Sequence, residues 1–429
     1  MKNFLVTFCT ILTCFSLKAQ PDYTPEELFS EGQYFYQRDD FKEALFFYKS
    51  LLDKFPDNAH FNFKVGECYL NIAGQEHLAV PYLEKAVQKV VPKKQFRERN
   101  FNEANAPLHA MYYLGNAYRA AGRLTEALEQ YKGFLDSPYF FGNYNFEVVE
   151  TEINSCERAV IIQDSPIKYT KTKLNDNINT ELSEFSPVMS ADGQTLVFVR
   201  ELKFYNAVFM SKKTSNGWGG AVNITQEIIS DGNFYPTGLN SSGTVMLLVK
   251  QENDNSDIYI SYYKDSRWGP AEKIAGKINT LAMETFASFG AGDKTIYFTS
   301  NRTGSKGKGD IYQSAMNPDS TWGKAKNLGK TINTKLDEET PVVCNNGKTL
   351  FFSSKGHDNM GGYDIFYTHY NNKKWSVPRN LGYPINTTRD NLFYISGPGC
   401  LTAIMSMVDT ETGISDIYEI TIGEPLVIP

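Results

Sequence analysis

The chain has 429 residues, of which 41% are hydrophobic and 21% are charged, and its formal net charge is −6. Its length is about three times that of a usual single domain, which predicts more than one hydrophobic core. The composition excludes a disordered chain, and the negative charge opposes nucleic-acid binding. Beyond the N-terminus no apolar run approaches the roughly 20 residues that span a membrane, so we expect a soluble mature protein.

The first twenty residues predict a secretory signal peptide. Lys2 precedes an apolar run from Phe4 to Leu17, and Ala19 supplies the small residue of a cleavage site. We assign residues 1–19 to this signal and expect an exported protein. The alternative is a lipoprotein signal ending at Cys14, although residues 11–13 lack the small side chains that usually precede such a cysteine.

Four cysteines follow the signal, and their spacing carries no metal motif. Cys68 and Cys156 are predicted to be buried on helix faces. Cys344 and Cys400 fall in the strand-rich region, where a disulfide between them is one option in an oxidising compartment.

Residues 20–164 are predicted to form a helical repeat domain. Three units place small and aromatic residues at the spacing of the tetratricopeptide repeat. Small residues let paired helices approach closely, and Pro56 ends the second helix of the first unit. An amphipathic stretch at 147–163 is expected to cap the array. The small repeat positions are Gly32, Ala44, Gly66, Gly115 and Ala127.

An insertion from about Pro92 to Pro107 interrupts the repeats. It places four cations beside two phenylalanines in an otherwise acidic chain. These cations are candidate contacts for an acidic partner, and a solvated loop is the alternative. Repeat arrays also present a concave groove that commonly holds a partner's peptide. The four cations are Lys93, Lys94, Arg97 and Arg99.

Residues 165–429 are predicted to form a β-propeller. A unit of roughly 53 residues replaces the helical period, and each unit contains four short strands. Asn-Gly and Asp-Gly pairs at Asn346 and Asp192 indicate hairpin turns. Two series of landmarks mark the units: Trp218, Trp268, Trp322 and Trp375, and then Asp257, Asp310, Asp364 and Asp416.

The last unit predicts how the ring closes. It lacks a tryptophan strand, and the segment 167–180 before the first blade aligns with the outer strand of the other units. We therefore expect an α-solenoid followed by a five-bladed β-propeller that is closed by its N-terminal strand. The tryptophans should pack between adjacent blades. The aspartates should bond turn backbone, and a calcium site is the alternative for them.

No catalytic or metal motif is present. The five histidines are scattered, and H-E-x-x-H, G-x-S-x-G and a glycine-rich phosphate loop are all missing from the sequence. We expect no enzyme activity, no cofactor and no metal. Three carboxylates are expected near the start of the innermost strands. There they could ring one mouth of the channel and receive a basic peptide or a cation. The alternative is that they satisfy backbone amides or simply meet water. They are Glu184, Glu284 and Glu338.

The repeat unit INT…E…P…DG.TL.FSS…GG.DIY…W..P.NLG resembles the WD40-like propeller repeat of TolB. Tetratricopeptide repeats followed by this propeller, behind a signal peptide, resemble the N-terminal part of PorE-like proteins. These are periplasmic subunits associated with the type IX secretion system. The resemblance implies a periplasmic protein that is peripheral to the outer membrane. Its implied partners are an outer-membrane β-barrel or other periplasmic secretion subunits.

One departure from the family affects the expected anchoring. PorE-like proteins continue into an OmpA-like peptidoglycan-binding domain, whereas this chain stops about nine residues after Asp-Ile-Tyr-Glu-Ile. We therefore expect only indirect contact with peptidoglycan.

These observations favour a non-catalytic periplasmic scaffold that holds one partner in the helical groove and another on a propeller face. One alternative is a propeller that senses a ligand or a glycan of the cell envelope in its channel. A propeller hydrolase is the other alternative.

Overall fold

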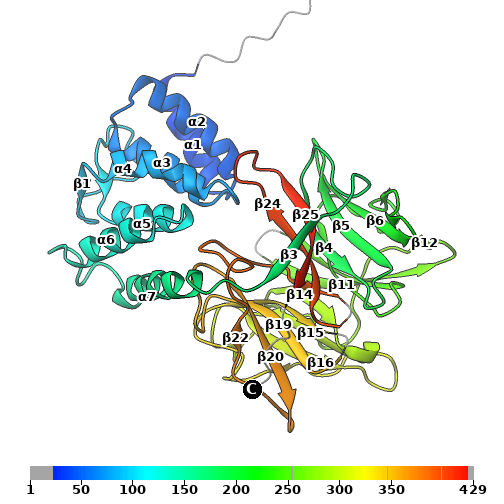
Figure 1. Ribbon diagram of the computed structural model, residues 1–429. Helices are drawn as coiled ribbons and strands as arrows, with labels where there is room; N and C mark the ends of the chain where they lie inside the picture. Colours follow the sequence, from blue (N-terminus) through cyan, green and yellow to red (C-terminus); the bar gives the residue numbers. More distant parts are fainter. Residues whose placement is uncertain (1–22, 253–254, 345, 398, 424–429) are drawn as a thin grey trace, which may run out of the picture.

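The computed structural model describes residues 23–252, 255–344, 346–397 and 399–423. The predicted signal peptide, residues 1–19, lies outside the described residues. Helices occupy most of the chain up to Gln163, and from Tyr169 onward the chain forms strands. The helical part and the propeller lie side by side (Figure 1). The predicted fold class is therefore confirmed.

Three helix pairs and a final single helix form the helical part. In each pair a glycine of the first helix faces a large side chain of the second, and a Cβ atom at that glycine would lie within 2.4 to 2.8 Å of it. Only glycine fits at this approach, which explains the repeated spacing. The contacts are Gly32 with Tyr48, Gly66 with Leu83 and Gly115 with Tyr131. The helices are α1 (Pro25–Tyr36), α2 (Phe41–Lys54), α3 (Ala59–Leu70), η1 (Glu76–Ala79), α4 (Val80–Ala86), α5 (Ala110–Ala120), α6 (Leu124–Leu135) and α7 (Phe146–Gln163).

Side-chain caps define several helix starts. The Thr24 hydroxyl accepts a hydrogen bond from the Glu27 amide, and the Glu27 carboxylate accepts one from the Thr24 amide. This reciprocal pair is a capping box and satisfies two amides that the helix itself leaves unpaired. At the starts of α2 and α3 the side chains of Asp40 and Asn58 accept from the amides of Glu43 and Phe61, without a reciprocal bond.

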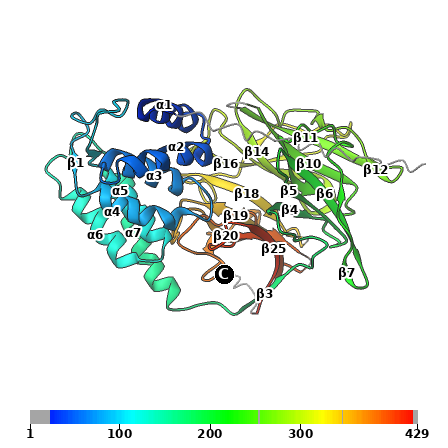
Figure 2. The same ribbon diagram turned by 90° about the horizontal axis from the view of Figure 1, so that it is seen from above.

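The strands from β3 (Tyr169–Lys173) onward form five antiparallel sheets, which are the blades of the propeller. Figure 2 shows these strands beside the helices. Blade 1 comprises β4 (Glu184–Met189), β5 (Thr195–Glu201), β6 (Asn206–Thr214), β7 (Gly217–Trp218) and β8 (Val222–Asn223). Blade 2 comprises β9 (Phe234–Leu239), β10 (Val245–Glu252), β11 (Asn255–Lys264), β12 (Arg267–Trp268) and β13 (Glu272–Lys273). Blade 3 comprises β14 (Glu284–Phe289), the short helix η2 (Ala291–Asp293), β15 (Thr295–Ser300), β16 (Asp310–Ala315) and β17 (Lys326–Asn327). Blade 4 comprises β18 (Glu338–Val343), β19 (Thr349–Ser354), β20 (Asp364–Asn371), β21 (Lys374–Trp375) and β22 (Arg379–Asn380). Blade 5 comprises β23 (Ile395–Ser396), β24 (Thr402–Val408), β25 (Ser415–Ile422) and β3 (Tyr169–Lys173).

The ring closes through β3, the first strand after the helices. This strand pairs antiparallel with β25 and so becomes the outer strand of blade 5. The Lys173 ammonium lies 2.7 Å from the Asp416 carboxylate, and in blade 2 the ammonium of Lys273 lies 2.6 Å from Asp257. A strand from the start of the propeller thus takes the place of an ordinary outer strand, and the predicted closure is confirmed.

Asparagines of the Ile-Asn-Thr motif repeat the same bond around the ring. The Asn279 side chain accepts from the Ile258 amide and donates to the Ile258 carbonyl, both at 2.9 Å. Asn179 makes the same two bonds to Ile417 of blade 5, although it precedes blade 1 in sequence. The asparagine bonds that join neighbouring blades are therefore also present between blade 5 and blade 1, where the ring closes.

The tryptophans pack between neighbouring blades, as predicted. Trp268 of blade 2 shares a buried cluster with Val188 and Val208 of blade 1. Trp218 of blade 1 shares one with Ile417 of blade 5. Their rings are therefore part of the blade interfaces, which aromatic burial stabilises.

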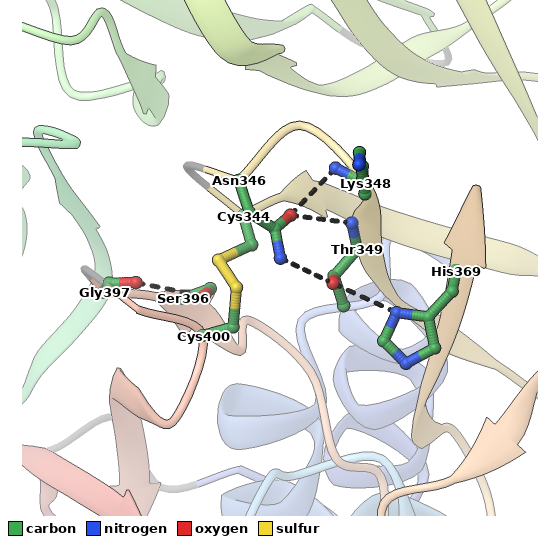
Figure 3. The surroundings of a disulfide bond; sticks show 8 residues. All are labelled: Cys344, Asn346, Lys348, Thr349, His369, Ser396, Gly397 and Cys400. Atoms are coloured by element: carbon green, nitrogen blue, oxygen red, sulfur yellow. Dashed lines mark hydrogen bonds between the residues drawn. A yellow bond between two sulfur atoms is a disulfide. The ribbon is translucent and has the colours of Figure 1, made fainter. Parts of the chain in front are cut away.

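A disulfide joins Cys344 of blade 4 to Cys400 of blade 5, with 5.7 Å between their Cα atoms (Figure 3). Both cysteines lie in the segments that lead from the inner strand of a blade to its second strand. The free cysteines, Cys68 and Cys156, are buried in α3 and α7 as predicted. The bond adds a covalent link between the last two blades.

We predict that replacing both Cys344 and Cys400 with alanine lowers the free energy of unfolding of the propeller by about 2–4 kcal/mol, because a cross-link restricts the unfolded chain. Urea unfolding followed by circular dichroism measures the change. Reducing the unaltered protein should produce a similar loss, and the double variant should not respond to the reductant. Equal stability of the oxidised protein and the double variant would contradict this.

Candidate binding site

The helical part docks on the propeller through polar contacts. The Arg158 guanidinium donates to the Asn359 carbonyl at 2.7 Å and to its side-chain oxygen at 2.9 Å, and the Ser155 hydroxyl donates to the same oxygen at 2.7 Å. The Arg389 guanidinium donates to the Ala120 carbonyl at 3.0 Å. Asn359 lies between β19 and β20, and Arg389 leads into blade 5. Both therefore belong to the propeller face on which the inner strands begin.

Two cavities lie near this face. The first, the interdomain cavity, has a volume of about 750 Å³ and is lined by both parts of the molecule. Its helical side includes the turns between paired helices, at Gly74 and Gly122, and its propeller side includes Met405 to Val408. The second, the channel cavity, has a volume of about 530 Å³. Leu392 and Phe393 line both, so the two cavities adjoin.

All five blades build the channel cavity from the same two positions of the repeat unit. These positions directly follow the residue that aligns with Glu184. Because the repeat places them at the beginning of each inner strand, they meet around the channel axis. The five pairs are Phe185 with Ser186, Tyr235 with Pro236, Thr285 with Phe286, Glu339 with Thr340, and Leu392 with Phe393.

Aromatic rings form much of the cavity wall. The ring centroids of Phe185 and Tyr235 lie 6.5 Å apart, and those of Phe286 and Phe393 lie 6.0 Å apart. Further along the channel, Phe286 packs with Val342 and Ile395 in a small buried cluster. The channel is therefore filled there, and the cavity is a bowl at one end of it.

The backbone of the bowl adopts uncommon conformations. Ser186, Thr340 and Phe393 have positive φ angles of 48°, 51° and 61°. The strand register also shifts between Phe185 and Val188. Left-handed backbone at a residue other than glycine costs on the order of 1 kcal/mol, and such residues and β-bulges are frequent at binding sites.

One carboxylate, that of Glu339, lies in the channel cavity. It accepts a hydrogen bond of 2.9 Å from the Thr285 hydroxyl. Burial raises the pKa of Glu339 to about 7. The Lys355 ammonium lies 4.5 Å from the centre of the Tyr363 ring, and no ion pair joins it to Glu339 within the described part of the chain.

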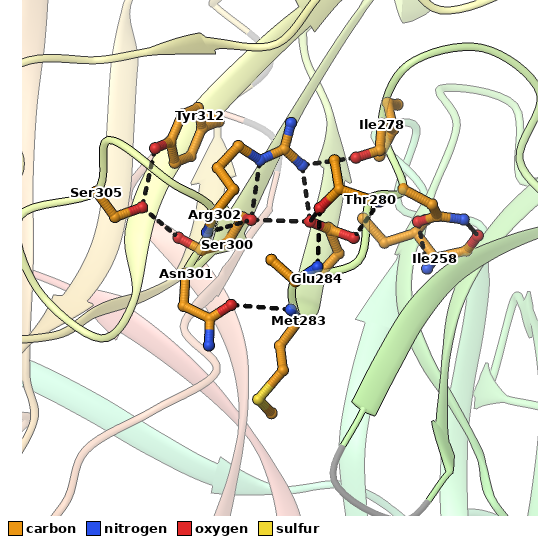
Figure 4. A network of polar contacts seen from close by, with 12 residues as sticks. Ile258, Ile278, Thr280, Met283, Glu284, Ser300, Asn301, Arg302, Ser305 and Tyr312 are labelled. Carbon is orange, nitrogen blue, oxygen red and sulfur yellow. Dashed lines mark hydrogen bonds and ion pairs between the residues drawn. The ribbon is translucent and has the colours of Figure 1, made fainter.

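The three glutamates predicted to ring the channel mouth do not lie there. Glu284 is fully buried and accepts hydrogen bonds from the Thr280 amide and hydroxyl, both at 2.9 Å (Figure 4). The Ser300 hydroxyl and the Arg302 guanidinium each donate to it at 2.8 Å. All of this bonding is internal to blade 3 and the loop before it.

Glu184 and Glu338 repeat this arrangement. Both are 0% exposed, and each accepts from the amide and the hydroxyl of the threonine four residues earlier. Arg200 pairs with Glu184, whereas Ser354 donates to Glu338. The channel-mouth hypothesis is therefore wrong for these residues, because their carboxylates hold the loop that precedes each inner strand. The alternative, that they satisfy backbone amides, describes them.

The repeated aspartates either accept hydrogen bonds from turn amides or form ion pairs with a lysine of an outer strand. Asp310 accepts from the amides of Lys306 and Gly307 at 3.0 Å, and Asp364 accepts from the Met360 amide at 2.7 Å. Turn bonding is thus confirmed in blades 3 and 4, while Asp257 and Asp416 pair with lysines instead. Within the described ranges, no group of three or more His, Cys, Asp or Glu side chains is placed to hold a metal ion.

The insertion after α4 is not a loosely solvated loop. Its short strands β1 (Val90–Val91) and β2 (Ala106–Pro107) pair in parallel. Phe96 packs edge-on against His60 of α3, with 5.0 Å between ring centroids. The insertion's Glu98 also forms a 2.7 Å ion pair with the buried Lys64 ammonium.

This packing corrects the expected use of the helical groove. Residues 59–69 of α3 are all buried. The inner face of the second repeat is therefore covered by the protein's own insertion and is not free to hold a peptide. The four predicted contact cations remain exposed on the insertion: Lys93, Lys94, Arg97 and Arg99.

A family model described as tetratricopeptide repeat matches residues 94–138. This range contains most of the insertion and the third helix pair. No protein of curated function matched the chain. None of the described helices is both long and apolar enough to cross a lipid bilayer.

Solved structures resemble each part of the chain. TolB from Acinetobacter baumannii is 14% identical with a TM-score of 0.38, over 65% of this chain and 71% of that one. An α-L-arabinofuranosidase from Lactobacillus brevis is 14% identical with a TM-score of 0.39, over 60% and 98% of the two chains. The first tetratricopeptide domain of human RPAP3 is 19% identical with a TM-score of 0.24, over 32% and 92%. At these values none of the three indicates what this protein binds or catalyses.

We predict that the contribution of three buried carboxyl groups to the stability falls as the pH rises from 5 to 8. Burial raises the pKa of Glu338, Glu339 and Asp364 to about 7, so the folded state holds these protons more tightly than the unfolded state does. Their contribution is complete below about pH 4.5 and is lost as the pH passes through 7. Urea unfolding at a series of pH values measures this dependence.

Replacing Glu339 with glutamine should remove the part of this pH dependence that Glu339 contributes. That part is a change in the free energy of unfolding on the order of 1–2 kcal/mol between pH 5 and pH 8. Glutamine keeps an acceptor for the Thr285 hydroxyl and carries no titratable proton. The matched control is Glu181→Gln, an exposed carboxylate in the loop before β4. An unchanged pH dependence in Glu339→Gln would contradict the assignment.

Proposed function

We propose that the protein is a non-catalytic scaffold of the cell envelope that joins protein partners on the face where the helical part meets the propeller. Tetratricopeptide repeats generally mediate contacts between proteins, and the docking of such an array on a propeller offers two adjacent surfaces to a partner. The observation that carries the proposal is the interdomain cavity, which adjoins the channel cavity on that same face.

Exposed apolar side chains on this face also support the proposal. Leu182, Leu281 and Leu336 occupy the loops that lead into the inner strands of blades 1, 3 and 4. Phe204, between β5 and β6, is also exposed. Large apolar groups that gather around one face of a protein are typical of an interaction surface.

A periplasmic location is the proposed compartment. It is supported by the apolar N-terminal segment and by the disulfide, since disulfides form and persist in oxidising compartments. The proposed partners are an outer-membrane β-barrel or periplasmic subunits of a type IX-like secretion complex. The protein would be peripheral to the outer membrane and would reach peptidoglycan only through its partners.

A propeller that senses a small ligand or an envelope glycan is the second candidate. The channel cavity favours it, because aromatic walls with a few polar groups are common in ligand sites. Thermal-shift measurements with envelope glycans separate the two candidates, since a scaffold should show no shift.

Site-specific photo-crosslinking in cells tests the scaffold. A photoreactive amino acid would replace Leu281 beside the channel, Ala73 beside the interdomain cavity or Lys94 on the insertion. We expect adducts with envelope proteins from Leu281 and Ala73, because both lie on the proposed docking face. Mass spectrometry of the adducts identifies the partners.

The control position is Lys264, which lies at the far end of β11 and is exposed. It should give no adduct with the same proteins. The absence of protein adducts from Leu281, Ala73 and Lys94 would count against the scaffold and favour the ligand-sensing propeller.

A further inference from the structure

The channel cavity holds a carboxylate that forms no ion pair with the described residues, because the nearby Lys355 ammonium lies over the Tyr363 ring. Of the described residues that line the cavity, Glu339 is the only acid and none is basic. Its hydrogen-bond partners are the hydroxyls of Thr285 and Thr299, whereas Glu284 receives four donor contacts, one of them from the Arg302 guanidinium. A partly buried carboxylate with so few donors is stabilised by a cation that enters beside it.

The surrounding side chains suit an organic cation better than a bare ion. Phe185, Tyr235 and Phe286 present aromatic rings to the cavity, and such rings attract ammonium and guanidinium groups and pack against their apolar stems. The buried Thr237 hydroxyl also lines the cavity and has no hydrogen-bond partner among the described residues.

The cavity also has a route for a polypeptide. Leu392 and Phe393 line both cavities, so a chain lying between the helical part and the propeller can place a side chain in the bowl. The cluster of Phe286, Val342 and Ile395 fills the channel beyond. The bowl therefore accepts one side chain from this side and does not let a chain pass through.

We propose that the channel cavity binds an arginine or lysine side chain of a partner's peptide, with the cation at Glu339 and the stem against the aromatic wall. This inference rests on the proposed scaffold function, because the peptide belongs to a protein partner that occupies the interdomain cavity.

Fluorescence anisotropy with the purified protein tests the cation. The probe is a labelled acetyl-Gly-Gly-Arg-Gly-Gly amide, compared with the same peptide carrying citrulline, which has nearly the same shape and no charge. We expect the arginine peptide to bind roughly tenfold or more tightly, as charge-assisted hydrogen bonds do. Equal affinity for the two peptides would overturn the proposal, as would a thermal shift by neutral glycans without peptide binding.

Two variants and one control variant test whether the preference for the arginine peptide arises in the channel cavity. Glu339→Gln should abolish the preference for arginine over citrulline, whereas Glu181→Gln, which removes a charge from an exposed loop on the same face, should keep it. Phe185→Leu should weaken both peptides, because the ring face is lost. Circular dichroism confirms that each variant is folded. A full arginine preference in Glu339→Gln refutes the site.

The pH provides an independent readout. Asp337, Lys355 and Tyr363 are the charged or titratable groups that face Glu339. Binding of the arginine peptide should be weaker at pH 5.5 than at pH 8, because Glu339 becomes protonated. A pH-independent affinity would contradict the role of Glu339.

A further comparison separates the peptide from a small cation. N-acetylarginine amide should bind more weakly than the pentapeptide, since it cannot reach the interdomain cavity. Equal affinity would overturn the proposal that the ligand is a peptide and would indicate a small cationic ligand. If the cells yield no crosslinked protein while the pentapeptide binds at Glu339, the scaffold function fails and the cation site stands.

Discussion

The pairing of β3 with β25 is the contact on which the arrangement of the whole molecule depends. It completes the fifth blade and removes the open edge that an incomplete ring would expose. Because β3 follows α7 after only the segment 164–168, the same pairing also fixes where the helical part leaves the propeller. The contacts of Arg158 with Asn359 and of Arg389 with Ala120 then hold the helical part against blades 4 and 5. The disulfide joins these two blades, and an ion pair of 3.3 Å between Lys42 of α2 and Glu201 adds a contact with blade 1.

The sequence predicted the features that repeat, because each repeated residue meets the same neighbour in every unit. The glycines of the helix pairs, the tryptophans between blades and the closing strand are of this kind. For Glu184, Glu284 and Glu338 the sequence left a channel-mouth role and a structural role open, although a signal for the structural role was available: each follows a threonine by four residues. Since the side chain of that threonine and its amide both bond the glutamate, the spacing indicates a structural carboxylate and not one that faces the channel.

Other features had no repeating signal. The covering of α3 by the insertion depends on Phe96 and Glu98 meeting His60 and Lys64, which are distant in sequence. The channel cavity depends on five residue pairs that share a position and differ in chemistry. In the pair Glu338 and Glu339, only the second lines the channel. The strand register shifts immediately after these residues, so simple alternation along a strand did not distinguish them.

The contrast between Glu284 and Glu339 separates structure from function in this propeller. Glu284 occupies a position that three blades share, and its oxygens receive four hydrogen bonds. Glu339 occupies a position that differs in every blade, is bonded by threonine hydroxyls and by no cation of the described residues, and lies next to Thr340, whose backbone is left-handed. A residue such as threonine, which blade 3 places there, would avoid the loss of stability that an ionised Glu339 brings at neutral pH. The buried carboxylate and the left-handed backbone thus occur at positions where the blades differ, whereas the glutamates that three blades share are fully hydrogen-bonded. This contrast indicates that the bowl serves binding and that the repeated positions serve the fold.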